Sequence, residues 1–80
     1  MNEFQPGSIY RHYKGNLYKA LHIAMHTETE EPLAIYQALY GEAKIWARPL
    51  SMFLDEVTLP DGSTVPRFEL IEKSFQENEI

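Results

Sequence analysis

Three turn signals divide the sequence into short apolar runs, and this spacing limits the folds that the chain can adopt. Gly15-Asn16 separates runs 9–14 and 17–25, Gly41 separates runs 33–40 and 44–48, and Pro60-Asp61-Gly62 separates runs 57–59 and 64–68. Glycine and asparagine tolerate the positive φ angles of tight hairpin turns, and proline sets φ at a first turn position. The sequence therefore predicts three β-hairpins.

Pro49 is expected to end the fourth run, because proline cannot donate a hydrogen bond to a central strand ladder. The segment 49–53 (PLSMF) is typical of one helical turn that opens with proline. Together these elements predict an all-β fold, a small SH3-like bent barrel of five or six short strands. The alternative is an α+β fold with a helix over 17–26, which also matches the helical period, or over 27–40.

The composition fits one small domain. The chain has 80 residues, 44% of them hydrophobic, and its 7 Lys+Arg and 12 Asp+Glu give a net charge of −5. We expect a single domain over 1–80, with an ordered body over about 7–71 and a polar tail over about 72–80. The absence of Cys excludes disulfides, thiol nucleophiles and Cys-ligated metals. Neither a signal peptide nor a run of about 20 apolar residues occurs, so we expect a cytoplasmic protein.

The predicted register of the first hairpin defines two faces. If Gly15-Asn16 is a two-residue loop, Tyr13 lies opposite Tyr18 and Arg11 lies opposite Ala20 on an outer face. The reverse face is expected in the core, because it carries the apolar series Leu21, Ile23 and Met25 together with Tyr10.

The second hairpin is predicted to separate aromatic from aliphatic residues. A three-residue loop over 41–43 places Tyr36, Ala38, Tyr40, Lys44, Trp46 and Arg48 on one face. The reverse face is aliphatic apart from Gln37, and it carries Leu33, Ile35, Leu39, Ile45 and Ala47. We expect the aliphatic face to be buried and the aromatic and basic face to be exposed.

The exposed faces of the two hairpins define the candidate binding residues. They are Arg11, Tyr13, Lys14, Tyr18, Tyr36, Tyr40, Lys44, Trp46 and Arg48. Aromatic rings offer stacking surfaces, and Arg and Lys attract anions. The alternative is that Trp46 and the tyrosines close one end of the barrel as core residues.

Motifs for catalysis and metal binding are missing from the sequence. His22 and His26 have the spacing of a helical zinc site, but the Glu of the zinc-protease motif is absent, and on a strand the two rings lie about 13 Å apart. The four glycines are isolated at turns, so they form no phosphate-binding loop. No serine lies in a nucleophile elbow. We therefore expect no metal, no cofactor and no enzymatic activity.

Four sequence blocks carry a resemblance to known proteins: YRHYKG at 10–15, YQALYG at 36–41, WARPLSMF at 46–53 and VPRFELI at 65–71. In these blocks, over about residues 7–71, the chain resembles an uncharacterised family of small bacterial domains of unknown function. The resemblance implies a compact, mainly β, cytoplasmic bacterial domain. It implies no assigned activity and no catalytic residues.

The candidate residues predict a noncatalytic binding module for single-stranded RNA or a nucleotide-like anion. Because the chain is acidic as a whole, we expect weak binding that fades as salt is added. The alternative is a protein–protein adaptor, because interface hot spots also combine aromatic rings with Arg, and a second copy of the chain is one candidate partner. We expect no association with membranes.

Overall fold

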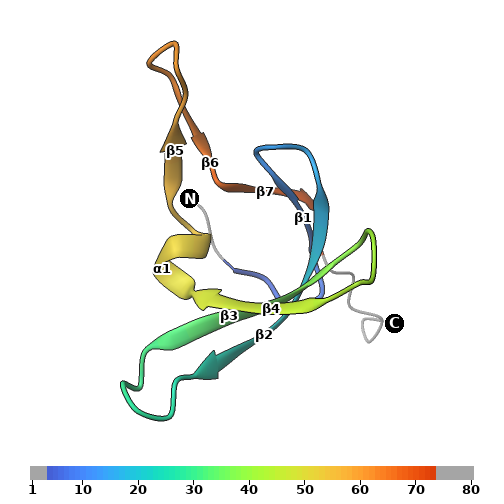
Figure 1. Ribbon diagram of the computed structural model, residues 1–80, viewed down its shortest axis with the longest axis vertical. Helices are drawn as coiled ribbons and strands as arrows, with labels where there is room; N and C mark the ends of the chain where they lie inside the picture. The colour runs from blue at the N-terminus through green and yellow to red at the C-terminus, as the bar shows by residue number, and fades with distance from the viewer. Residues whose placement is uncertain (1–3, 74–80) are drawn as a thin grey trace, which may run out of the picture.

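The computed structural model describes residues 4–73, which form seven strands and one short helix (Figure 1). In chain order the elements are β1 (Ile9–His12), β2 (Leu17–Met25), β3 (Pro32–Ala38), β4 (Ile45–Pro49), α1 (Leu50–Phe53), β5 (Glu56–Thr58), β6 (Thr64–Pro66) and β7 (Phe68–Glu72). Five strands form a bent antiparallel sheet in the order β4-β3-β2-β1-β7, and β5 and β6 form a separate hairpin.

The all-β, barrel-like fold predicted from the turn signals is confirmed, with more strands than the five or six expected. The helical turn at Pro49 is also confirmed, because α1 begins directly after this proline. The α+β alternative is wrong, because 17–25 form strand β2 and 32–38 form strand β3. Within the described residues, no helix is long and apolar enough to cross a membrane.

The predicted register of the first hairpin is wrong. The structure pairs Tyr10 with Tyr18 and Ile9 with Lys19, and the His12 N–H donates to the Asn16 carbonyl at 2.8 Å. The loop is therefore residues 13–15, with Gly15 at a φ of +115°. Three-residue hairpin loops end on such a positive-φ position, and the resulting shift by an odd number of residues exchanges the two faces of β2. Tyr10, Tyr18 and Ala20 consequently share the inner face.

The predicted core series on β2 is wrong as well. The pairing of β2 with β3 shifts between Ala20 and His22, which indicates a β-bulge. Beyond the bulge, 46% of the surface of Ile23 and 59% of the surface of Met25 are exposed. Leu21 is only half-buried.

The second hairpin keeps the predicted partition of residues but reverses which face is buried. Tyr36 pairs with Trp46, so the loop spans 39–43, two residues longer than predicted, and the even shift leaves the two faces intact. Tyr36 and Ala38 point into the core, whereas Ile45 on the aliphatic face is 60% exposed. The expectation of a buried aliphatic face is therefore wrong. The aromatic face lies on the concave side of the bent sheet, where its rings fill the core. A small domain has few other residues that can fill this space.

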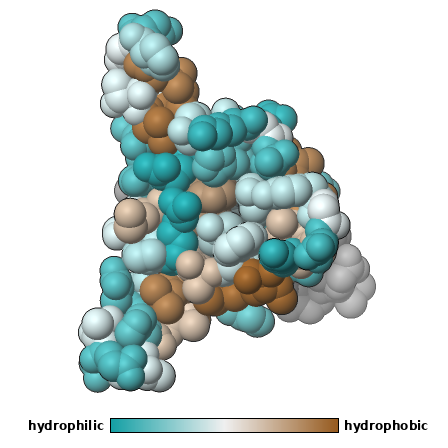
Figure 2. Space-filling view, viewed as in Figure 1, coloured by the Kyte–Doolittle hydropathy of each residue, from teal (hydrophilic) through white to brown (hydrophobic). Residues whose placement is uncertain are grey.

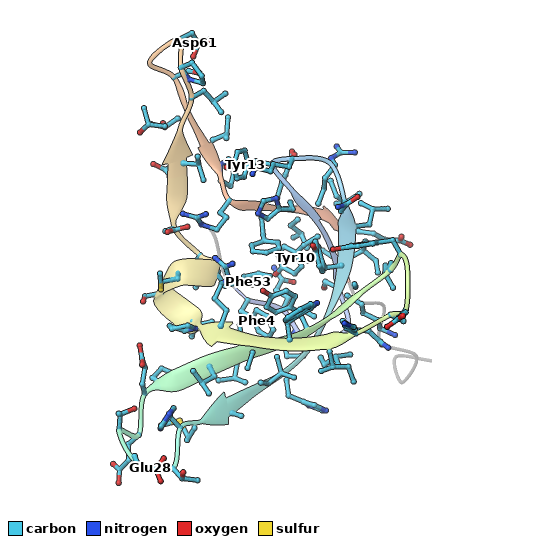
Figure 3. The ribbon with its side chains drawn as sticks, in the orientation of Figure 1. Phe4, Tyr10, Tyr13, Glu28, Phe53 and Asp61 are labelled. Atoms are coloured by element: carbon cyan, nitrogen blue, oxygen red, sulfur yellow. The ribbon has the colours of Figure 1, made fainter. Side chains whose placement is uncertain are left out.

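The core consists mainly of aromatic rings (Figure 3). The rings of Phe53 and Phe68 stack with centroids 4.1 Å apart and an interplanar angle of 3°. Phe4 and Tyr10 meet Phe53 edge-on at 5.1 and 5.2 Å, and Tyr36 meets it at 5.2 Å. Phe53 thereby joins the short helix to β1, β3 and β7.

The β5–β6 hairpin projects from the body, as Figure 1 shows. Its predicted turn at residues 60–62 is confirmed, because Val57 pairs with Val65 and the Leu59 N–H donates to the Ser63 carbonyl at 2.8 Å. The base of the hairpin is fixed by Arg67, which donates two hydrogen bonds to the Asp55 carboxylate at 2.7 and 3.2 Å. Most of the expected polar tail, 74–80, lies outside the described residues.

Candidate functional site

The concave face of the five-stranded sheet brings together five of the nine candidate residues. These are Tyr18 on β2, Tyr36 on β3, Tyr40 in the β3–β4 loop, and Trp46 and Arg48 on β4. Lys44 lines a pocket beside Trp46. Three candidates lie elsewhere: Arg11 reaches the Glu69 carboxylate at 4.0 Å, and Tyr13 and Lys14 lie in the β1–β2 loop.

The tyrosines of the concave face form a connected cluster. The hydroxyl groups of Tyr18 and Tyr40 share a hydrogen bond of 2.7 Å, and the Tyr18 ring meets Tyr36 edge-on at 5.4 Å. Burial, reinforced by the hydrogen bond with Tyr40, raises the pKa of Tyr18 to about 12. Tyr36 is buried, so the cluster is the floor of the site rather than a surface on which a ligand can stack.

A pocket of about 240 Å³ lies at the edge of this cluster. Ala38, Tyr40, Glu42, Lys44 and Trp46 line it. Trp46 and Tyr40 are 47% and 45% exposed, so both rings offer a face to a ligand. Lys44 lies 3.9 Å from the Glu42 carboxylate, and this exposed pair contributes little stability, so the Lys44 ammonium can turn to an incoming anion.

Arg48 lies two residues beyond Trp46 on the same side of β4. Its Nε donates to the Tyr36 hydroxyl at 3.3 Å, and the guanidinium carbon lies 5.9 Å from the centroid of the Phe68 ring. No carboxylate of residues 4–73 lies within 4.0 Å of the Arg48 nitrogens. The guanidinium is therefore held in place by rings while its positive charge is not paired with an acid.

The surroundings of His12 contain several cationic side chains. Its imidazole ring meets the Phe68 ring edge-on at 5.0 Å, and its Nδ1 accepts a hydrogen bond from the Lys14 backbone N–H at 3.2 Å. Burial lowers the pKa of His12, and the positive charges of Arg48, Arg67 and Lys14 lower it further. These three cations come from separate parts of the chain, so their convergence is a tertiary effect.

Sequence reasoning did not select His12 or Arg67, which lie near Arg48 in the folded chain. His12 alternates with Tyr10 along β1, which is a signal for the inner face once the correct loop length is known. Arg67 carries no such signal, because 55 positions separate it from His12 in the sequence. A second pocket, about 310 Å³ in volume, lies between the β1–β2 loop and β6, where His12 and Tyr13 face Val65.

Neither of the two remaining histidines, His22 and His26, belongs to this site. The Nδ1 atom of His26 accepts hydrogen bonds from the backbone N–H groups of Glu28 and Thr29 at 3.1 and 3.3 Å, which orders the β2–β3 turn. His22 is exposed on β2. In the part of the chain that the structure describes, no three His, Asp or Glu side chains are grouped to hold a metal ion. The predictions of no metal and no cofactor stay predictions.

Figure 2 shows how these side chains appear on the surface. The tips of both projecting hairpins are hydrophilic, whereas residues of intermediate hydropathy fill much of the face between them. Fold and site together define a small, all-β, barrel-like domain with an aromatic concave face edged by basic side chains.

Comparison with known proteins identifies the family of this domain. The chain belongs to the family described as "Protein of unknown function (DUF1653)", which matches residues 8–70. It is also similar to a solved structure, described as the crystal structure of a protein of this DUF1653 family from Bordetella bronchiseptica. The two chains are 36% identical with a TM-score of 0.77, over 94% of this chain and 96% of the other. No curated protein matches the chain. The resemblance to an uncharacterised family is thereby confirmed.

Proposed function

We propose that this domain is a noncatalytic binding module that takes a nucleotide-like anion at the pocket beside Trp46. The observation that carries the proposal is the exposed Trp46 ring with a cation on each side, Lys44 in the pocket and Arg48 two residues along the strand. Two residues of a strand span about 7 Å, so a base stacked on Trp46 leaves its phosphate within reach of Arg48.

The charge distribution supports an anionic ligand. The whole chain has a net charge of −5, yet Arg48, which lies beside Trp46 on β4, has no carboxylate partner within residues 4–73. An anion approaching this side gains from the local positive potential, while the acidic remainder of the chain weakens its long-range attraction. We expect weak binding that declines with added salt.

The structure favours a short ligand over a long RNA strand. Tyr36 is buried and Tyr18 is half-buried, which leaves Trp46 and Tyr40 as the exposed rings of the concave face. Tyr13 lies at the other pocket, beside β6. Two adjacent rings accommodate one or two bases, so a mononucleotide or dinucleotide matches the site.

The test is an NMR titration of the labelled protein with adenosine 5′-monophosphate, at low and at physiological salt. We expect shifts at the Trp46 indole and at residues 38–48, and affinity about tenfold lower in Trp46→Ala, because stacking contributes about 1–3 kcal/mol per base. Arg48→Met is expected to weaken binding, whereas Lys19→Met, which removes a cation from the outer face, is expected to have no effect. Adenosine and inorganic phosphate alone separate stacking from charge.

Three results would overturn the proposal. They are the absence of shifts at millimolar nucleotide, binding unchanged by Trp46→Ala, and an equal loss of affinity in Lys19→Met and Arg48→Met. The last result would mean that net charge, and not the site, attracts the nucleotide.

A further inference from the structure

Among residues 4–73, the outward backbone groups of β4 pair with no other strand. β4 is an edge of the five-stranded sheet and pairs only with β3 among the described residues. The Ala38 N–H donates to the Lys44 carbonyl at 2.9 Å, which fixes the phase of the ladder. In an antiparallel ladder the bonding direction alternates, so Trp46 and Arg48 bond to β3 while the N–H and C=O groups of Ile45 and Ala47 point away from it.

The position of Pro49 is consistent with this alternation of hydrogen bonds along β4. It follows Ile45 and Ala47 in the same alternation, so its nitrogen lies on the open side, where the missing N–H costs no hydrogen bond to β3. The open edge therefore presents two N–H donors and two C=O acceptors within three residues, 45–47. This is the pattern that an added antiparallel strand pairs with.

The side chains of this edge indicate the chemistry of the added strand. Ile45 and Trp46 are 60% and 47% exposed, and Figure 2 shows a hydrophobic patch over β4. Lys44 and Arg48 stand on either side of Trp46 on the concave face. An added strand consequently meets cation, ring and cation on one face and apolar side chains on the other.

A second copy of this chain does not fit the edge. The two-fold register that uses all four backbone groups places Ile45 opposite Ala47 of the other copy. The same register sets Lys44 opposite Arg48 of the other copy, twice in the dimer, and like charges directly opposite destabilise a strand pair. Acidic side chains at these two positions convert both repulsions into attractions.

We propose that the β4 edge binds an extended acidic peptide by strand addition, with carboxylates opposite Lys44 and Arg48 and an aromatic or apolar residue opposite Trp46. This inference goes beyond the nucleotide proposal, because the backbone of Ile45 and Ala47 supplies the main contacts. It assigns the domain a protein partner through a segment of alternating acidic and apolar residues.

The probe is the blocked peptide Ser-Glu-Val-Tyr-Val-Glu-Ser, whose Tyr lies opposite Trp46 and whose two Val residues lie opposite Ile45 and Ala47. We expect binding to shift the backbone amide signals of Ile45 and Ala47 in NMR spectra. Ala47→Pro removes an outward N–H without removing a bond to β3, and affinity is expected to fall about tenfold or more. Ala47→Val keeps this N–H and is the matched control, with affinity expected to be unchanged.

A second series uses the unaltered protein, so it does not depend on the folding of any variant. N-methylation of one Val blocks a hydrogen bond to β4 and is expected to abolish binding, whereas N-methylation of Tyr, whose N–H points away, is expected to preserve it. Replacing both Glu by Lys is expected to abolish binding through charge repulsion.

Each result decides the proposal. No shifts with the acidic peptide at millimolar concentration would overturn it, and so would equal affinity for the two N-methylated peptides or for the Lys peptide. The nucleotide titration separates the two proposals, because nucleotide binding requires the Trp46 ring and is indifferent to Ala47→Pro.

Discussion

Phe53 is the buried residue of a helix of four residues, and its removal tests how the fold is held together. A single helical turn is not stable alone in water, so α1 depends on tertiary contacts. Phe53 is 0% exposed and contacts four aromatic rings, with Phe68 stacked at 4.1 Å and Phe4, Tyr10 and Tyr36 within 5.2 Å.

The expected cost of Phe53→Ala follows from this packing. A fully buried Phe replaced by Ala loses about 3–5 kcal/mol, and a tightly surrounded site does not lie at the lower end because its neighbours cannot collapse into the space. The free energy of unfolding of an 80-residue domain is about 4–12 kcal/mol. We therefore expect a loss of about 4 kcal/mol, which leaves the variant marginally folded. Phe53→Leu, closer in volume, is expected to lose about 1.5 kcal/mol.

The assay is urea unfolding followed by circular dichroism. Met52→Ala is the matched control, because Met52 lies in the same turn with 49% of its surface exposed, and it is expected to change stability by less than about 0.5 kcal/mol. A loss below about 1.5 kcal/mol for Phe53→Ala at an unchanged urea slope would refute the reasoning. Equal losses for the two alanine variants would refute it as well.

Three further predictions concern charge and hydrogen bonds. Folding lowers the pKa of His12, so the unfolded chain takes up a proton first as the pH falls. The free energy of unfolding is therefore expected to decrease below about pH 6.5, and to decrease less in His12→Phe. Unfolding experiments across pH 5–8 measure both profiles. Parallel pH profiles for the two proteins would contradict this. Asp55→Asn removes the charge that pairs with Arg67 in a partly buried, two-bond geometry, and urea unfolding is expected to show a loss of about 1–2 kcal/mol; no loss would mean that the hairpin base is held by its backbone alone. Tyr40→Phe removes the hydrogen bond that helps to raise the pKa of Tyr18, so ¹³C NMR titration is expected to show this pKa below about 12, and an unchanged value would assign the shift to burial.

Much of the fold could be predicted from local signals. The turns at Gly15, Gly41 and residues 60–62, and the helical turn after Pro49, lie where glycine and proline indicated them. The register of the first hairpin could not be predicted, because Gly15-Asn16 is compatible with loops of two and of three residues. That one-residue difference in loop length moved Tyr18 from the expected outer face to the inner face.

The candidate site was predictable in composition and not in arrangement. Tyr36, Trp46 and Arg48 share a face in the prediction and in the structure, because side chains alternate along a strand whatever its surroundings. Their exposure differs from the prediction: Tyr36 is buried and supports Arg48, while Trp46 remains half-exposed. Neither the alternation of side chains along a strand nor their hydropathy predicts which face of a bent sheet is concave.

Local sequence signals were enough to predict the class of fold, the sites of its turns and the residues that alternate along each strand, since all of these depend on neighbouring residues. Which face became the core depends on long-range packing, because the sheet closes over Phe53 and Phe68, and Tyr36 packs against these rings. Tertiary structure also places Arg67 beside Asp55, and it places Arg48 and Arg67 close enough to His12 to lower its pKa. These contacts join distant segments, so they arise only when the whole chain has folded.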